Sequence, residues 1–106
     1  MLSNETNFCV YLILCDKNRL YTGISNRPKE RFLAHVDGKG ARFTKMYPPI
    51  EMRILISGLT KSEALRSEHA TKKLNAQTKR QLWSQLPTFI QVPVFSQISA
   101  EDCQPV

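Results

Sequence analysis

Four side chains that could transfer protons or bind phosphate fall within 25 residues near the start of the chain. Tyr11 and Tyr21 occupy two neighbouring apolar segments, and Arg31 and His35 follow them, four residues apart. A carboxylate, Glu68, comes much later. Phenol and imidazole groups can transfer protons, a guanidinium can neutralise charge on a phosphate, and a carboxylate can hold a hard divalent cation. Together these residue types suit the hydrolysis of a phosphodiester.

Glu68 is expected on the inner side of a helix. It follows Ala64 and Leu65 by one helical turn, and these two apolar residues should mark the side that faces the sheet. A carboxylate in that position must be paired, protonated or bound to a cation. Taken alone, Glu68 is explained more simply by an ion pair with Lys72, which would contribute roughly a few tenths of a kcal/mol.

The other residues also have structural explanations when each is considered singly. A tyrosine within an apolar strand, such as Tyr11 or Tyr21, usually belongs to the core and bonds its hydroxyl to a neighbour. Arg31 and His35 fit the solvated face of a helix. Gly23, near the end of a strand, would let another backbone or a ligand approach closely. Only the combination favours a functional site.

Composition limits the class of protein. The chain has 106 residues, 42% of them hydrophobic, which predicts one domain with one core. The net charge of +6 favours a polyanionic partner, most often nucleic acid. No apolar stretch is long enough to span a bilayer and no secretory leader is recognisable, so we expect a cytoplasmic protein.

The three cysteines, Cys9, Cys15 and Cys103, predict neither a disulfide framework nor a zinc site. Cys9 and Cys15 would lie about 20 Å apart on one strand, too far to bridge. We expect thiols in a reducing compartment.

The hydrophobic pattern predicts elements in the order β-β-α-β-α-α. Residues 8–15 and 19–24 should form an antiparallel hairpin, with residues 8–15 central because they are apolar at almost every position. The later elements are expected as a helix from about Pro28 to Val36, a strand at 50–57, a helix from the Thr60 capping box to about Leu74, a short helix to Trp83 and a strand or draped segment within 88–95. The predicted fold is α/β, an α+β sandwich on a central three-stranded antiparallel sheet.

Residues 37–49 contain two glycines and two prolines, which predicts a loop. Lys39, Arg42 and Lys45 in this loop, together with Arg27 before it, could contact phosphates, although a solvated basic run is the ordinary explanation. On the helix expected from about Pro28 to Val36, Phe32, Leu33 and Val36 should share one side. Arg31 and His35 should lie on the opposite side. For the whole chain, we expect a loose N-terminus at 1–7, a domain at 8–86 and a partly disordered C-terminal extension at 87–106.

The spacing of the site residues resembles the signature of the GIY-YIG nuclease superfamily. The two motifs correspond to Cys9-Val10-Tyr11 and Tyr21-Thr22-Gly23, the family arginine to Arg31 and its metal-binding glutamate to Glu68. Cys9-Val10 replaces Gly-Ile, and Thr22 replaces isoleucine, but both tyrosines and Gly23 are kept.

This resemblance covers about residues 8–83. The run from His35 to Lys45 is similar to the small single-domain bacterial branch, whereas the nuclease of nucleotide excision repair and the homing endonucleases join the same module to other domains. Asn75 is the candidate for the family's later asparagine, and a helix N-cap would explain it equally well.

The resemblance implies a metal-dependent endonuclease that cleaves nucleic acid, DNA rather than RNA. Glu68 would hold one Mg²⁺ or Mn²⁺, Arg31 would neutralise charge on the phosphate, and Tyr11, with help from Tyr21, would orient or deprotonate the attacking water. Arg31 and the metal would have to lower the Tyr11 pKa from about 10. His35 would act as a proton shuttle or phosphate contact. We expect Tyr11, Tyr21, Arg31 and Glu68 to surround one cleft.

Two other classes of function stay open. One is a non-catalytic nucleic-acid-binding module on the same scaffold, and the other is a structural or partner-binding domain. Retention of the tyrosines, Arg31 and Glu68 argues against the first, and the positive charge argues against the second. No appended DNA-binding domain is visible, which leaves a role for a targeting partner protein.

Overall fold

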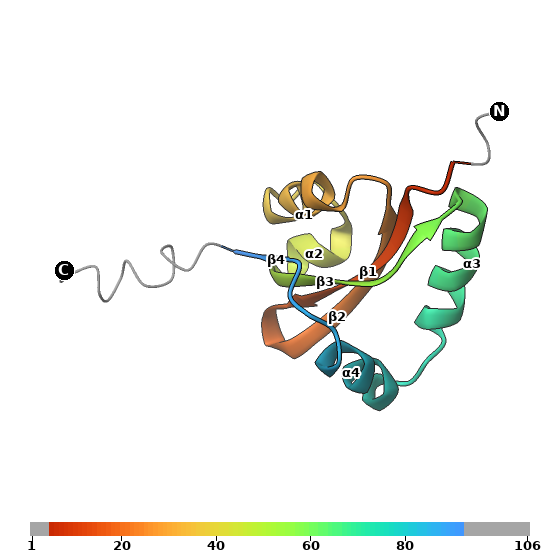
Figure 1. The fold of residues 1–106 in the computed structure, drawn as a ribbon. Coiled ribbons are helices and arrows are strands. Elements are labelled where there is room, and N and C mark those ends of the chain that lie inside the picture. The colour runs from red at the N-terminus through yellow and green to blue at the C-terminus, as the bar shows by residue number, and fades with distance from the viewer. Residues whose placement is uncertain (1–4, 93–106) are drawn as a thin grey trace.

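A four-stranded antiparallel sheet organises residues 5–92, the part of the chain that the computed structural model describes (Figure 1). The strand order is β2-β1-β3-β4, so β1 is central and β2 forms one edge. The strands are β1 (Phe8–Cys15), β2 (Arg19–Ser25), β3 (Pro49–Leu59) and β4 (Ile90–Gln91). The helices are η2 (Asp16–Asn18, a 3-10 turn), α1 (Pro28–Val36), α2 (Arg42–Met46), α3 (Lys61–Lys72) and α4 (Ala76–Ser84).

The central position predicted for residues 8–15 is confirmed. β1 pairs with β2 on one side and β3 on the other, and its Val10, Leu12 and Ile13 are completely buried. A strand that is covered on both faces needs apolar residues at successive positions, which is the pattern of this segment.

The sheet has four strands rather than the predicted three. β4 pairs with β3 in antiparallel register, and flanking backbone bonds run from Phe89 N–H to the Met52 carbonyl and from Val92 N–H to the Ile50 carbonyl. β4 lies within the expected segment 88–95, in the part of the chain assigned to the C-terminal extension. Residues 1–4 and 93–106, with Cys103 among them, lie outside the described part.

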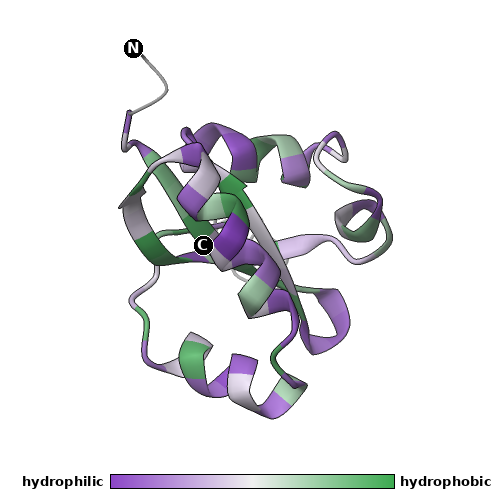
Figure 2. Cartoon of the chain, turned by 90° about the vertical axis from the view of Figure 1, so that its right-hand side faces the viewer, coloured by the Kyte–Doolittle hydropathy of each residue, from purple (hydrophilic) through white to green (hydrophobic). Residues whose placement is uncertain are grey.

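The two faces of the sheet are covered by different helices. On one face, Tyr11 and Ile13 pack in a core with Phe32 of α1 and Phe43 of α2. Strand alternation directs Leu12 to the other face, where α3 packs against β1 and β2. Figure 1 shows α1 and α2 on one side of the sheet and α3 on the opposite side. Figure 2 views the molecule from the α3 side and shows hydrophobic strand segments behind helices that carry both hydrophilic and hydrophobic residues. No helix within residues 5–92 is long and apolar enough to cross a membrane.

The predicted orientation of α1 is wrong. Phe32 and His35 are the residues that it buries, whereas Leu33 and Val36 are 48% and 43% exposed. The reason is that polar bonds are available beneath the helix, and these let an imidazole occupy a place that the apolar pattern assigned to leucine and valine.

The predicted loop at 37–49 contains the short helix α2. Its first turn is held by the Thr44 hydroxyl, which accepts from Ala41 N–H at 3.3 Å and donates to the Ala41 carbonyl at 3.0 Å. Phe43 and Tyr47 stack with ring centroids 5.1 Å apart and anchor the helix to the core. The glycines and prolines that predicted a loop lie outside the five helical residues.

The two later helices begin where their caps predict. Thr60 and Glu63 form a reciprocal capping box at α3, and Asn75 Oδ1 accepts from Thr78 N–H at α4. The inner side of α3 differs from the prediction in one respect: Ala64 is fully buried, but Leu65 is 46% exposed. Contacts with β3 hold α4 in place. The guanidinium carbon of Arg53 lies 4.1 Å from the centre of the Trp83 ring, and the guanidinium donates to the backbone carbonyl of Trp83 at 2.7 Å.

Candidate active site

A buried hydrogen bond joins the central strand to the first helix. The Tyr11 hydroxyl lies 3.0 Å from His35 Nε2, and the rings meet edge to face at 72°. Both residues are almost completely shielded from solvent. The structure therefore brings together the phenol and the imidazole that the sequence singled out.

Thr44 contacts the second ring nitrogen of His35, Nδ1. The Thr44 hydroxyl lies 2.8 Å from His35 Nδ1 and has only one proton of its own, which it donates to the Ala41 carbonyl. In this arrangement Nδ1 carries the proton and donates to Thr44. Nε2 is then unprotonated in the neutral ring and accepts from the Tyr11 hydroxyl. The result is a directed chain of hydrogen bonds from Tyr11 through His35 and Thr44 to Ala41.

Tyr21 and Gly23 complete the aromatic cluster from the edge strand. The Tyr21 ring packs against His35 with centroids 5.2 Å apart. Gly23 pairs with Tyr11 across the sheet, and a Cβ at Gly23 would lie 2.4 Å from the Tyr11 hydroxyl oxygen. A residue with a side chain at position 23 would collide with the Tyr11 ring, which lies over β2 at this point. This crowding supports the structural role assigned to Gly23.

Arg31 reaches the same cluster through the backbone of Gly40. Its guanidinium donates to the Gly40 carbonyl at 3.3 Å. A Cβ at Gly40 would lie 2.2 Å from His35 Nδ1, so the bare backbone of this residue packs directly on the imidazole. One glycine thus contacts both the cation and the histidine.

Burial sets the protonation states of the pair. It lowers the pKa of His35 to about 4, and the positive charge of Arg31 contributes in the same direction. Burial also raises the pKa of Tyr11 well above its ordinary value, although Arg31 opposes this shift. Arg31 acts on Tyr11 in the expected direction, but desolvation outweighs it in the chain alone, so a lowering of the Tyr11 pKa by Arg31 together with a metal stays a prediction. At neutral pH both groups are uncharged.

Glu68 does not share a face of the sheet with Tyr11. It lies on α3, forms an ion pair with Lys72 at 3.2 Å, and its side chain is 19% exposed. No described contact joins Glu68 to Tyr11, Tyr21 or Arg31, so the expected single cleft around the four residues stays a prediction. α1 and α3 lie on opposite faces of the sheet, and each of them packs against both β2 and β3 (Figure 1).

The donor set around Glu68 limits how a metal could be held. Within residues 5–92 there is no group of three or more histidine, cysteine, aspartate or glutamate side chains that could bind a metal ion. Mg²⁺ often uses one or two carboxylates and takes its other ligands from water and substrate phosphates. A lone, half-buried carboxylate fits a cation of that kind, shared with the substrate, and does not fit a metal held by the protein alone.

The basic residues predicted to bind nucleic acid surround an open hollow. Lys39, Arg42 and Lys45 are exposed and line a depression of about 290 Å³ with the backbone of the 38–41 turn. Arg27 lies beside Arg31 on a neighbouring depression and makes a weak ion pair with Glu30 at 3.8 Å. Arg31 therefore lies between two cationic surfaces.

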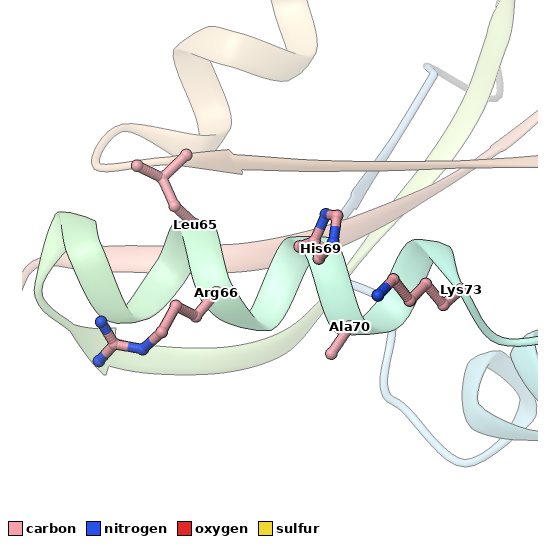
Figure 3. Close-up of a pocket in the computed structure, with 5 residues that line it drawn as sticks. All are labelled: Leu65, Arg66, His69, Ala70 and Lys73. Atoms are coloured by element: carbon pink, nitrogen blue, oxygen red, sulfur yellow. The ribbon is translucent and has the colours of Figure 1, made fainter.

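A wider hollow lies elsewhere in the described part of the chain. It occupies about 480 Å³ along α3 and is lined by Leu65, Arg66, His69, Ala70 and Lys73 (Figure 3). All five side chains come from α3 and the residue that caps it, so no second element lines this hollow. This hollow has no arrangement that would support catalysis.

Two residues of the site were not identified from the sequence. Both lie in the run 35–45 that carries the family resemblance, but Gly40 was otherwise interpreted as a loop glycine and Thr44 was given no role. A signal was the Gly-x-x-x-Thr spacing at 40–44, which begins five residues after His35. Its meaning depends on α2, which the loop prediction omitted.

Comparison with known proteins agrees with the motif spacing. The family model described as the GIY-YIG catalytic domain matches residues 7–81. UPF0213 protein NMC1807 of Neisseria meningitidis is 51% identical over 82 residues, which are 77% of this chain and 90% of that protein. UPF0213 protein H16_B0156 of Cupriavidus necator is 37% identical over 86 residues, 81% and 94% of the two chains.

A more distant relative has the same kind of name. UPF0213 protein YazA of Bacillus subtilis is 38% identical over 73 residues, 69% of this chain and 74% of that protein. These names state no activity. No solved structure matches the chain significantly.

Proposed function

Because the chain belongs to the GIY-YIG catalytic domain family, whose members are generally nucleases, we propose that it is a metal-dependent endonuclease. Its substrate would be a phosphodiester bond in nucleic acid, DNA rather than RNA. The observation that carries the proposal is the directed hydrogen-bond chain from Tyr11 to His35, with Arg31 beside it.

Proton transfer in this proposal begins at a neutral phenol. The high pKa of Tyr11 argues against a standing phenolate, so the hydroxyl would take a proton from the attacking water only while it passes its own proton to His35 Nε2. The water oxygen forms the new bond to phosphorus, the leaving oxygen departs with the old bond's electrons, and His35 becomes an imidazolium. A bound phosphate beside Arg31 would offset the positive charge that lowers the His35 pKa and so favour this transfer.

Arg31 and Glu68 would act on the phosphate from different sides of the β2 edge. Arg31 would neutralise developing negative charge. Glu68 would hold the metal together with the substrate, and a bound Mg²⁺ or Mn²⁺ would supply Lewis-acid stabilisation of the phosphoryl oxygens. In this arrangement a substrate would lie across the edge strand β2, where Arg31 of α1 and Glu68 of α3 would contact it from the two faces of the sheet.

The exposed cations would bind the nucleic-acid backbone. Arg27 shares one depression with Arg31, and Lys39, Arg42 and Lys45 line another with Gly40, whose carbonyl Arg31 contacts. In this proposal, these cations would form a basic track along the nucleic acid. Such contacts fix position without reading sequence. We expect the protein to act in the cytoplasm and to depend on a targeting partner where one particular site must be found.

Burial of the pair supports a second candidate. Tyr11 and His35 are shielded in the chain alone, so a substrate reaches the hydroxyl only if neighbouring groups move. If they do not move, the pair is structural and the protein is a nucleic-acid-binding module.

Nicking of supercoiled plasmid separates the two candidates. We expect nicks with Mg²⁺ or Mn²⁺, none with EDTA, and markedly fewer from Arg31→Ala with Mg²⁺. A panel of flaps, junctions, single strands and RNA then identifies the preferred substrate. Salt-dependent retardation of DNA without any cleavage across the panel would support the binding module and reject the nuclease.

A further inference from the structure

We infer that Thr44 is a positioning residue whose hydroxyl holds His35 in the one tautomer able to accept a proton from Tyr11. The catalytic consequence of this inference rests on the proposed function, but the tautomer itself does not. Neither the family match nor the names of the relatives assign a role to Thr44.

The geometry favours one bonding pattern for the Thr44 hydroxyl. It is buried, it lies 3.0 Å from the Ala41 carbonyl, and a carbonyl can only accept. Its lone pairs then receive Ala41 N–H at 3.3 Å and His35 Nδ1–H at 2.8 Å. All three bonds form at once only when the His35 proton is on Nδ1.

The tautomer decides the direction of the bond to Tyr11. With the proton on Nδ1, His35 Nε2 carries a lone pair 3.0 Å from the phenolic oxygen and can take its proton. With the proton on Nε2, the ring would donate to Tyr11 and could not accept. Tyr11 therefore could not pass its proton to a His35 that is protonated on Nε2.

A purely structural role for Thr44 predicts different behaviour. Its bonds to Ala41 also hold the first turn of α2, so loss of the hydroxyl would loosen this helix whether or not the tautomer matters. Met46→Gly provides the control, because Met46 is an exposed residue at the end of α2 and glycine weakens the helix without touching His35. Thr44→Ser keeps the hydroxyl, whereas Thr44→Val keeps the shape and removes it.

The direct test is ¹⁵N NMR of the histidine rings in the full chain at pH 7. The only other histidine, His69, is exposed on α3 and serves as the internal reference, with His69→Gln to assign the signals. We expect the wild type, Thr44→Ser and Met46→Gly to show a protonated Nδ1 and an unprotonated Nε2 at His35. Thr44→Val should show a mixed or reversed tautomer while His69 is unchanged.

Cleavage assays form the second arm. Thr44→Val should lower kcat at least about tenfold, an effect of the size of a weakened acid–base step, with DNA affinity within about twofold and activity restored by serine. Two NMR results would overturn the inference. One is a His35 that stays protonated on Nδ1 in Thr44→Val, and the other is a wild-type His35 that is protonated on Nε2. The second result does not depend on the folding of any variant. A wild type that cleaves nothing would overturn the proposed function, and the NMR arm would still decide the role of Thr44.

Discussion

The Tyr11 hydroxyl and His35 Nε2 are 3.0 Å apart although the residues are separated by 24 positions in the chain. This contact forms because two glycines leave room for the two rings. Gly23 lies against the Tyr11 ring and Gly40 against the His35 ring, each closer than a Cβ atom would permit. The geometry of the pair therefore depends on two residues that have no side chain.

Gly40→Ala tests this dependence. The added methyl would lie 2.2 Å from His35 Nδ1, so either the imidazole or the 38–41 turn must shift. We expect a loss of about 1–3 kcal/mol in the free energy of unfolding, typical of overpacking, and loss of any cleavage activity. Urea denaturation and plasmid nicking measure the two effects.

Gly58→Ala is the matched control for this change. Gly58 has φ +75 with nothing near its Cβ position, so alanine there should cost about 1 kcal/mol through backbone strain alone. Cleavage by this variant should be unchanged. Equal stability of Gly40→Ala and wild type would show that the His35 ring is not held by the Gly40 backbone.

The order of the elements and the central strand were predictable because they depend on local signals. An uninterrupted apolar run indicates a strand covered on both faces, and the Thr60 and Asn75 caps mark helix starts by bonds within one turn. The spacing of Tyr11, Tyr21 and Arg31 likewise identified residues that the fold brings to one face.

The orientation of α1 and the position of Glu68 were not predictable in the same way. The apolar pattern of α1 favoured Leu33 and Val36, whereas the fold buries His35 because Tyr11 and Thr44, distant in sequence, satisfy both of its nitrogens. Which face of a sheet a later helix covers depends on chain crossings rather than on its own residues, so the sequence could not place Glu68 opposite Tyr11.

The stability of the protein should fall with pH before its carboxylates titrate. His35 has an ordinary pKa of 6.5 and a folded pKa of about 4, so between these values the unfolded chain binds a proton that the folded chain does not. Stability from this group is complete above pH 6.5 and is lost as the pH falls toward 4. We expect a decrease of about 2 kcal/mol between pH 7 and pH 5, measured by urea denaturation.

Replacement of either histidine provides the control. His35→Gln should abolish the decrease between pH 7 and pH 5, and His69→Gln should retain it. Burial raises the pKa of Glu51, but hydrogen bonds from Arg53 and Thr88 together with the charge of Arg53 lower it by more. Glu51 therefore affects the pH dependence of stability mainly below pH 4.5 and does not interfere. A pH-independent wild type over this range would mean that His35 is not neutral and buried as described.

Glu68→Gln should remove Mg²⁺-dependent cleavage while the protein stays folded. The amide keeps the shape of the side chain but lacks the charge that a hard cation requires. Lys72→Gln is the matched variant, since it breaks the same ion pair from the other side. We expect Lys72→Gln to cleave like the wild type in Mg²⁺ titrations. If both variants behave alike, the role of Glu68 is limited to the ion pair.

The basic track should determine how salt affects DNA binding. Alanine at Lys39, Arg42 or Lys45 should remove one phosphate interaction and reduce the slope of log affinity against log salt by about 0.9 on duplex DNA. The control for the triple alanine variant replaces three exposed cations of the α3 region with alanine, which removes the same charge; these are Lys61, Arg66 and Lys73. Equal slopes for the two triple variants would mean that net charge, rather than the 39–45 surface, governs binding.

Tyr11→Phe separates catalysis from structure most directly. Phenylalanine keeps the ring that packs under Gly23 and removes only the hydroxyl bonded to His35. The free energy of unfolding should fall by about 1–2 kcal/mol, because one hydrogen bond is removed and His35 Nε2 is left unpaired. If Tyr11 passes the proton of the attacking water to His35, single-turnover cleavage should slow by roughly 10²–10⁴ with unchanged DNA affinity. Arg31→Ala should weaken both cleavage and binding, since its charge acts on the phosphate. A Tyr11→Phe variant that cleaves within a few-fold of wild type would remove the tyrosine from the mechanism and assign water activation to other groups.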